Sequence, residues 1–321
     1  MLSNEHGTQL AELFFGPEVF KHPVLIDIVE QIEFVHQASL AGDIYSLLIT
    51  GLSRCGKSFI GIRYAELHQP FHLDGVKQTP ILYVKLNGAK SSVDVLNQII
   101  LALGGPESKT GTKPHTVQER LTKLFPEHGV QMVFIDEVQD CLPQSDGKQA
   151  QEMAKQFCRL FDDSGIPFVL LGTPSAKRLV NIRFGKNNDN LLLVKTDEEQ
   201  VSGRMLAPLN LPTIFPRTQC WIDCVQFFLD KFNLPSEIAT NKLLLNRIYV
   251  ATEGRLGFLE KLMFIVSTKK FATSSTMQMF ERAYKLAFCP KPDNPFNEEA
   301  FTDHTIKSMT HKMEPTDDLI C

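Results

Sequence analysis

The sequence predicts an α/β fold in which helices flank a parallel sheet, followed by a small all-helical subdomain. Short apolar runs alternate with segments of helical periodicity in the first two thirds of the chain, which is typical of crossover units in parallel sheets. A glycine-rich loop directly follows the first of these runs and directly precedes a helical segment. Beyond residue 212 the periodicity is helical, without a convincing strand pattern.

Each apolar run is short and uninterrupted, as expected of strands buried on both faces. Between the runs, apolar residues recur every three to four positions, which predicts helices. The expected strands cover residues 44–49, 81–86, 131–135 and 167–171, with a fifth at 205–206. The expected helices cover residues 24–40, 59–68, 92–103, 117–125, 149–161, 175–180, 220–232, 240–252, 256–268 and 275–288.

Turn signals and changes in composition divide the chain into four parts. Gly16-Pro17 ends a weakly patterned amino-terminal stretch, and the residues after 290 are polar and rich in proline. Disorder is the simpler interpretation of this last stretch, and a partner-binding segment is the alternative. The predicted organisation is an arm at 1–17, an α/β domain at 18–211, a helical subdomain at 212–289 and a tail at 290–321.

The composition narrows the class of protein. The 321 residues include 33 basic and 37 acidic side chains, a formal net charge of −4 that excludes a polybasic binder but allows a local basic strip. No apolar run approaches the ~20 residues that span a bilayer, and the start of the chain lacks the features of a signal peptide. We therefore expect a cytoplasmic protein without a membrane partner, whose seven scattered cysteines are reduced.

The glycine-rich loop fits the phosphate-binding pattern GxxxxGK[ST] at every fixed position. Glycines let successive backbone N–H groups point at phosphate oxygens, and the start of the next helix adds its positive dipole end. Lys57 is expected to reach the β- and γ-phosphates of ATP as a catalytic residue, and Ser58 to bind Mg²⁺. The predicted nucleotide-binding residues are Gly51, Ser53, Arg54, Cys55, Gly56, Lys57, Ser58 and Phe59.

Two acids, Asp136 and Glu137, directly follow the apolar run at 131–135. Ligands of open parallel sheets bind at the carboxyl ends of the strands, where this pair is expected to lie. Asp136 is the predicted Mg²⁺ ligand, directly or through water, and Glu137 is the predicted catalytic residue that polarises the attacking water. Together with the phosphate loop, the pair predicts an ATPase.

Three further residues are predicted to act in catalysis, each with a simpler alternative. Thr173, after the run at 167–171, either contacts the γ-phosphate or the attacking water, or caps the next helix. Arg204, just before the fifth expected strand, is placed like an arginine finger for a neighbouring subunit's nucleotide, although a lone arginine is usually a solvated charge. Arg255, in the helical subdomain, either contacts its own subunit's nucleotide or is an ordinary charge.

These motifs together resemble an AAA+ ATPase, through the segments GLSRCGKS, VFIDE, LLGTPSA, EEQVSGRM and the EGR of a helical lid. Residues 20–270 are further similar to the TnsC/TniB family of bacterial transposition regulators, through His22-Pro23, the LGTP at 171–174 and the stretch at 200–209. The chain length is similar to that of ATPases of CRISPR-associated transposons. The loop departs from the family, which more often has glycine or small residues at these variable positions, in having Leu52-Ser53 followed by Arg54 and Cys55.

The resemblance implies an ATP-dependent protein that assembles as rings or filaments on double-stranded DNA and links a target-selector protein to the transposase. Hydrolysis then controls assembly, and Arg204 acts on the ATP of the neighbouring copy. The resemblance also implies contacts with the DNA phosphate backbone from two stretches that match in position. They contain Lys90, Lys109, Thr110 and Lys113, although surface lysines are often simply solvated.

Other classes of protein share the phosphate loop. A helicase loader or replication-initiator-like AAA+ ATPase also binds ATP and DNA, but residues 212–290 show no strand pair for the winged helix that initiators usually carry. A small-molecule kinase fits the acid pair and Arg204 less well. A nucleotide-gated scaffold with negligible hydrolysis differs only in whether Glu137 acts.

Overall fold

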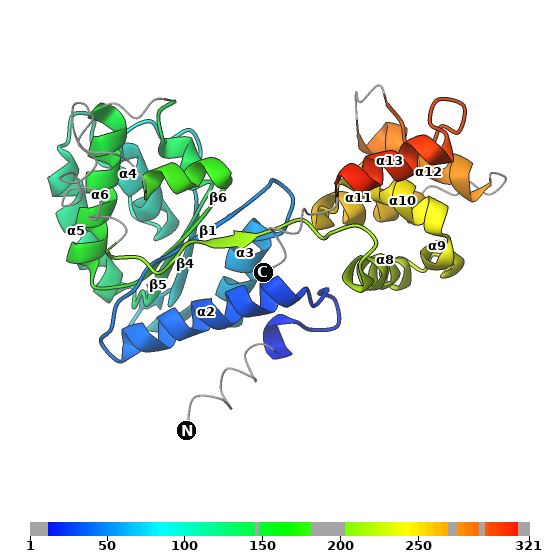
Figure 1. Ribbon diagram of the computed structural model, residues 1–321. Helices are drawn as coiled ribbons and strands as arrows, with labels where there is room; N and C mark the ends of the chain where they lie inside the picture. The colour runs from blue at the N-terminus through cyan, green and yellow to red at the C-terminus, as the bar shows by residue number, and fades with distance from the viewer. Residues whose placement is uncertain (1–11, 145–147, 181–202, 269–274, 289–292, 314–321) are drawn as a thin grey trace. The chain divides into compact units, whose positions relative to one another are not determined.

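The computed structural model describes residues 12–144, 148–180, 203–268, 275–288 and 293–313, drawn in colour in Figure 1. The chain divides into two compact units. Unit 1 comprises Met1–Gly16, Pro23–Leu52 and Lys57–Leu211, and unit 2 comprises Pro17–His22, Ser53–Gly56 and Pro212–Cys321. Residues 18–211 were expected to form one domain, but two short segments within that range cluster with unit 2 instead.

Unit 1 is built on a parallel five-stranded sheet with the strand order β4-β5-β6-β1-β7. Because every pairing is parallel, the carboxyl ends of the strands lie at one edge of the sheet. β6 separates β1 from β5, and the three are buried along their whole length. The strands are β1 (Leu47–Gly51), β4 (Ile81–Lys85), β5 (Met132–Asp136), β6 (Phe168–Gly172) and β7 (Leu209–Leu211).

Three helices cover one face of this sheet (Figure 1). They are α4 (Ser92–Ala102), α5 (Pro114–Glu127) and α6 (Lys148–Ser164). Their apolar side chains share one buried core with alternate strand residues such as Val133 and Ile135. α4 begins at a capping box and α5 begins at a proline, both of which are common helix starts.

The other face of the sheet carries α3 (Lys57–Leu67), which follows β1, and α2 (Pro23–Leu40) extends along the same unit. α3 lies very close to the sheet at Gly61, where a Cβ atom would come within 2.8 Å of the Tyr83 ring. The amino-terminal residues also reach α3, because Phe14 is buried and the Arg63 guanidinium donates to the carbonyl of Leu13 at 3.1 Å.

Several short elements differ from the expectations. A separate hairpin of β2 (Phe71–Leu73) and β3 (Val76–Gln78) was not predicted, and the fifth strand is Leu209–Leu211, with only an isolated bridge at Met205. The helix expected at 175–180 is the 3-10 helix η2 (Pro174–Leu179), and a further 3-10 helix, η1 (Val138–Cys141), follows the acid pair. The hairpin was missed because each of its strands has three residues only.

The described part of unit 2 is helical around a core of its own. Within the described residues, no helix of the protein is both long enough and apolar enough to cross a membrane. The helices of unit 2 are α8 (Gln219–Lys231), α9 (Glu237–Thr240), α10 (Lys242–Thr252), α11 (Leu256–Thr268), α12 (Thr276–Ala287) and α13 (Asp303–Lys312).

The prediction of a disordered tail from residue 290 is wrong for residues 293–313. Phe296 is 1% exposed and stacks on Phe280, with ring centroids 5.2 Å apart. The buried guanidinium of Arg247 in α10 donates to the carbonyl of Phe301 at 2.9 Å and to the carboxylate of Asp303 at 2.8 Å. One aromatic anchor and one buried arginine thus hold a segment whose polar composition suggested disorder.

Candidate nucleotide site

The phosphate loop connects β1 directly to α3. Gly51 must be glycine because a Cβ atom there would lie 2.5 Å from the carbonyl oxygen of Leu211 in the neighbouring strand β7. Arg54 and Gly56 have positive φ angles of 67° and 110°, which curl the backbone between strand and helix. The glycine at 56 adopts this conformation freely, whereas the arginine at 54 adopts it with strain.

Lys57 is folded back into its own loop. Its Nζ donates to the carbonyl oxygens of Gly51 at 2.9 Å and Leu52 at 2.8 Å, and the side chain is buried. The ammonium group therefore lies at the centre of the loop, where the motif places the phosphate-binding charge. Ser58 follows in the first turn of α3, and Phe59 in the same turn is partly exposed and contacts the ring of Phe14.

The tip of the loop, Ser53–Gly56, belongs to unit 2. The carbonyl oxygen of Arg54 accepts a hydrogen bond from the N–H of Gly257 at 2.9 Å, while Cys55 is buried. Arg255, two residues before Gly257, donates to the carboxylate of Glu253 at 2.5 Å and lies over the ring of Phe258. The Arg255 side chain is thus held by neighbours in its own helical segment.

Asp136, at the end of β5, is completely buried, and each of its carboxylate oxygens accepts a hydrogen bond. Oδ1 accepts from the N–H of Glu137 at 2.8 Å, and Oδ2 accepts from the hydroxyl of Tyr83 at 2.6 Å. Burial raises the pKa of Tyr83 well above its usual value, and the bond to Asp136 raises it further. The Tyr83 hydroxyl therefore holds one of the two residues predicted to bind Mg²⁺.

Glu137 has a left-handed backbone, with φ 56° and ψ 39°, and its carboxylate accepts a hydrogen bond. Oε2 accepts from the amide of Gln139 at 2.6 Å, and the same amide accepts from the N–H of Thr173 at 3.0 Å. The Thr173 hydroxyl pairs with Ser175 at 2.7 Å and makes no capping bond to η2. Gln139 thus links the ends of β5 and β6, which bear two of the predicted catalytic residues.

Arg204 lies near the amino ends of the parallel strands, whereas the phosphate loop lies at their carboxyl ends. Its carbonyl accepts from the N–H of Ser46, just before β1, whereas the loop follows the end of that strand. At about 3.3 Å per residue, the five residues of β1 separate these positions by roughly 16 Å. The guanidinium makes a two-pronged ion pair with Asp162 near the end of α6, at 2.5 and 2.8 Å.

The residues predicted to contact DNA lie on two exposed stretches that precede helices. Lys90 comes just before Ser91, the N-cap of α4, and Lys113 is the N-cap of α5. Lys109 and Thr110 are exposed in the connection between these helices, where the Lys109 carbonyl accepts from Thr112. Both stretches thus combine a lysine with the N-terminus of a helix, which attracts anions.

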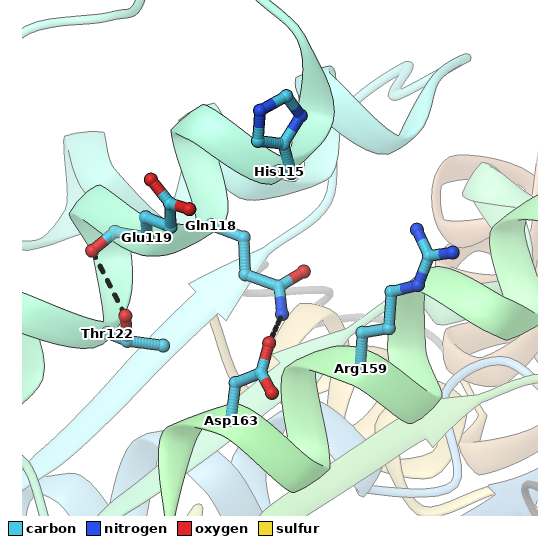
Figure 2. A pocket seen from close by; sticks show the side chains of 6 residues that line it. All are labelled: His115, Gln118, Glu119, Thr122, Arg159 and Asp163. Atoms are coloured by element: carbon cyan, nitrogen blue, oxygen red, sulfur yellow. Dashed lines mark hydrogen bonds between the residues drawn. The ribbon is translucent and has the colours of Figure 1, made fainter.

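A cavity of about 340 Å³ lies between α5 and α6 (Figure 2). The buried amide of Gln118 donates to Asp163 and accepts from Gln156, so the floor of the cavity is held by a satisfied polar network. Acidic and basic side chains both line the cavity, but none of the predicted site residues is among them. The lining residues are His115, Gln118, Glu119, Thr122, Arg159 and Asp163.

Two residues of the candidate site were not predicted. Gln139 could have been noticed, because it is a polar residue two positions after the acid pair. Tyr83 could not, because its contact with Asp136 depends on the register in which Tyr83 faces Phe134 across β4 and β5. Nothing in the local sequence specifies that register.

Comparison with known proteins identifies the family of the chain. Residues 15–183, more than half of the chain, match the family model described as Bacterial TniB protein. No curated protein is significantly similar in sequence.

Solved structures are similar in fold at low sequence identity. The ORC2 protein of Aeropyrum pernix, described in ADPNP-ADP complexes, matches with a TM-score of 0.53 and 14% identity, over 81% of this chain and 67% of that chain. CDC6P from Pyrobaculum aerophilum matches with a TM-score of 0.54 and 14% identity, over 86% and 71%. At this identity the similarity concerns the fold, which is that of AAA+ P-loop ATPases, as predicted. The family match on a chain with this fold shows that the protein belongs to the TniB family.

Proposed function

We propose that this protein binds and hydrolyses ATP, and that ATP controls its assembly on duplex DNA during transposition. The observation that carries the proposal is the phosphate loop with a buried, inward-folded Lys57, on the same sheet edge as Asp136 and Glu137. In the proposed complex, phosphate oxygens take the place of the Gly51 and Leu52 carbonyls as partners of Lys57. Backbone N–H groups of the loop bind the remaining oxygens.

The residues around Ser58 and Asp136 suit Mg²⁺. They offer a hydroxyl and a buried carboxylate, which are hard oxygen donors of the kind Mg²⁺ prefers, and the Tyr83 hydroxyl holds the carboxylate. Mg²⁺ bound there would neutralise charge on the phosphates. Ser58 and Asp136 would hold the ion, directly or through water, together with oxygens of the nucleotide.

In the proposed hydrolysis, Glu137 accepts a proton from the attacking water and Thr173 orients that water or the γ-phosphate. Arg204 supplies positive charge to the nucleotide of a neighbouring copy, because β1 separates it from its own loop. Arg255 is proposed to contact the nucleotide of its own chain after leaving Glu253. ATP bound between copies then stabilises the assembly, and hydrolysis weakens it.

Membership of the TniB family, together with the role in transposition that the resemblance implies, supports the remaining parts of the proposal. We propose that Lys90, Lys109, Thr110 and Lys113 bind the DNA backbone, and that the assembly links a target-selector protein to transposase subunits in the cytoplasm. Helix N-termini beside lysines bind phosphates without regard to base sequence, which suits a protein that must accept many target sites.

Electron microscopy with duplex DNA and Mg²⁺ tests the proposed function. Rings or filaments are expected with a non-hydrolysable ATP analogue, and single particles with ADP. The variant Glu137→Gln should bind ATP but release no phosphate, whereas Glu127→Gln, an exposed acid at the end of α5, should behave as the wild type. Single particles under both nucleotide conditions would contradict ATP-controlled assembly.

A scaffold with negligible hydrolysis is a second candidate, and one observation favours it. The Gln139 amide holds the Glu137 carboxylate at 2.6 Å, which withdraws that group from an attacking water. If this contact limits hydrolysis, Gln139→Ala should raise ATP turnover several-fold. Gln219→Ala, which removes an amide bonded to Asp223 in unit 2, is the matched control. Zero turnover in both Gln139→Ala and the wild type would favour the scaffold.

A further inference from the structure

Tyr83 occupies a fixed position beside the proposed metal ligands. It lies on the edge strand β4, and its hydroxyl is 2.6 Å from Oδ2 of the completely buried Asp136. Ser58 lies in the first turn of α3, the helix against which the Tyr83 ring packs at Gly61. A phenol hydroxyl donates its one proton and a carboxylate oxygen accepts, so Tyr83 is the donor to Asp136.

Packing, not only hydrogen bonding, sets the position of the Tyr83 ring. A Cβ atom at Gly61 in α3 would lie 2.8 and 2.9 Å from two ring carbons of Tyr83 and 3.1 Å from Phe134. The ring is therefore pressed against the helix that carries Ser58. Because the ring is packed in this way, its hydroxyl has a fixed position, and a hydrogen bond can orient a ligand only from a fixed position.

We infer that Tyr83 is a positioning residue for divalent-cation binding, which holds the Asp136 carboxylate in a fixed orientation. This inference rests on the proposed function and adds to it a residue that the AAA+ motifs do not contain. A buried carboxylate needs hydrogen-bond donors, and Tyr83 supplies one of the two that Asp136 has among the described residues. Without the hydroxyl, Oδ2 loses its donor, and the orientation of the carboxylate depends on the bond from the Glu137 N–H to Oδ1.

The variant Tyr83→Phe tests the inference, because it keeps the ring and removes the hydroxyl. Binding of Mn²⁺, a spectroscopic substitute for Mg²⁺, is measured by electron paramagnetic resonance with a non-hydrolysable ATP analogue present. Loss of a residue that orients a ligand typically weakens metal affinity by about 10–100-fold, and we expect a change of this size. Affinity for a fluorescent ATP analogue in EDTA should stay within about twofold, because the phosphate loop is untouched.

Two further variants complete the experiment. Tyr45→Phe, at a partly exposed tyrosine, is the matched control and should leave Mn²⁺ affinity unchanged. Gly61→Ala keeps the hydroxyl but displaces the ring, so it should weaken Mn²⁺ binding as Tyr83→Phe does. Circular dichroism confirms that each variant is folded.

The outcomes separate this inference from the proposed function. Wild-type Mn²⁺ affinity in Tyr83→Phe, with nucleotide binding intact, overturns the role of Tyr83 and leaves the ATPase proposal standing. Failure of the wild-type protein to bind nucleotide at all overturns both. Equal loss of nucleotide affinity with and without metal also overturns the inference, because it indicates a general disturbance of the loop.

Discussion

Arg54 and Glu137 both adopt a left-handed backbone that side chains disfavour, and both end a strand-to-loop transition at the candidate site. Such conformations persist where the surrounding structure enforces them, and they are common at functional sites. For Arg54 the enforcing contact is the bond from Gly257 to its carbonyl oxygen. For Glu137 the backbone conformation aims the carboxylate toward Gln139.

Replacing Arg54 by glycine should stabilise the protein by roughly 0.5–1 kcal/mol. The left-handed conformation costs a residue with a side chain about 1–2 kcal/mol, which glycine avoids. Glycine loses more conformational entropy on folding than arginine does, so only part of this stabilisation remains. Urea unfolding measures the change. Arg54→Ala, which keeps the strain and removes the charge, should show no such gain; equal stabilisation by both variants would point to the charge instead of the backbone.

At the scale of elements, α6 fixes the segment that carries Arg204 through the ion pair with Asp162. This pair is partly exposed, so it contributes about 0–1 kcal/mol to stability. Asp162→Asn should therefore unfold at nearly the wild-type temperature, as measured by differential scanning fluorimetry, and keep ATPase activity.

Arg204→Ala should likewise remain folded and bind nucleotide as a monomer, but its assembled form should not hydrolyse ATP. Mixing Arg204→Ala with Glu137→Gln subunits provides the control, because each then supplies the group that the other lacks. Full activity of Arg204→Ala alone would refute the action of this residue on a neighbouring copy.

The folded carboxyl-terminal segment leads to a prediction for unit 2. Phe296 is buried against Phe280 and Tyr284, so Phe296→Ala should destabilise the protein by about 3–5 kcal/mol in denaturant unfolding. Leu286→Ala, at a side chain that is 58% exposed, should change stability by less than about 0.5 kcal/mol. Similar small effects in both variants would mean that the segment adds little to the unit.

Much of the element layout could be predicted from the sequence, because buried strands and amphipathic helices leave strong periodic signals. β5 and β6 lie within one residue of their expected ranges, since four or five consecutive apolar residues define each. β2 could not be predicted, because Phe71 and Leu73 are exposed and the strand is too short for a period to emerge. α13 was missed because its apolar face is small, with Ile306 as its buried apolar residue, and a buried arginine in another helix helps to hold its segment.

The phosphate loop and the acid pair could be predicted because each is a contiguous motif. Their supporting contacts could not, since they join residues far apart in sequence. Tyr83 meets Asp136 across 53 positions, and Gln139 meets Thr173 across 34. The predicted roles of Glu137 and Thr173 in catalysis and of Asp136 in Mg²⁺ binding remain predictions.

At the scale of the whole molecule, a net charge of −4 must be reconciled with the proposed binding to DNA, a polyanion. A small basic patch is repeated once per copy in a ring or filament, so assembly multiplies it. Reversing the charges of Lys109 and Lys113 together should weaken ATP-dependent DNA binding in fluorescence anisotropy titrations. The slope of log affinity against log salt should flatten by about one for each DNA phosphate that a lysine no longer neutralises.

The double variant Lys148→Glu with Lys177→Glu carries the same change of charge on other exposed residues, and it should bind DNA as the wild type does. If both double variants bind DNA equally weakly, net charge rather than a local interaction explains the effect.

The inward-folded Lys57 also has a consequence for selectivity. Its ammonium group already donates hydrogen bonds to two carbonyl oxygens, so an anion must displace them before it can bind the lysine. When a small, singly charged ion binds, Lys57 exchanges its two carbonyl partners for one weak partner, so little free energy is gained. In the proposed complex a triphosphate brings several oxygens, which reach Lys57 and the backbone amides together, so we expect the loop to select polyvalent ligands over the abundant simple anions of the cell.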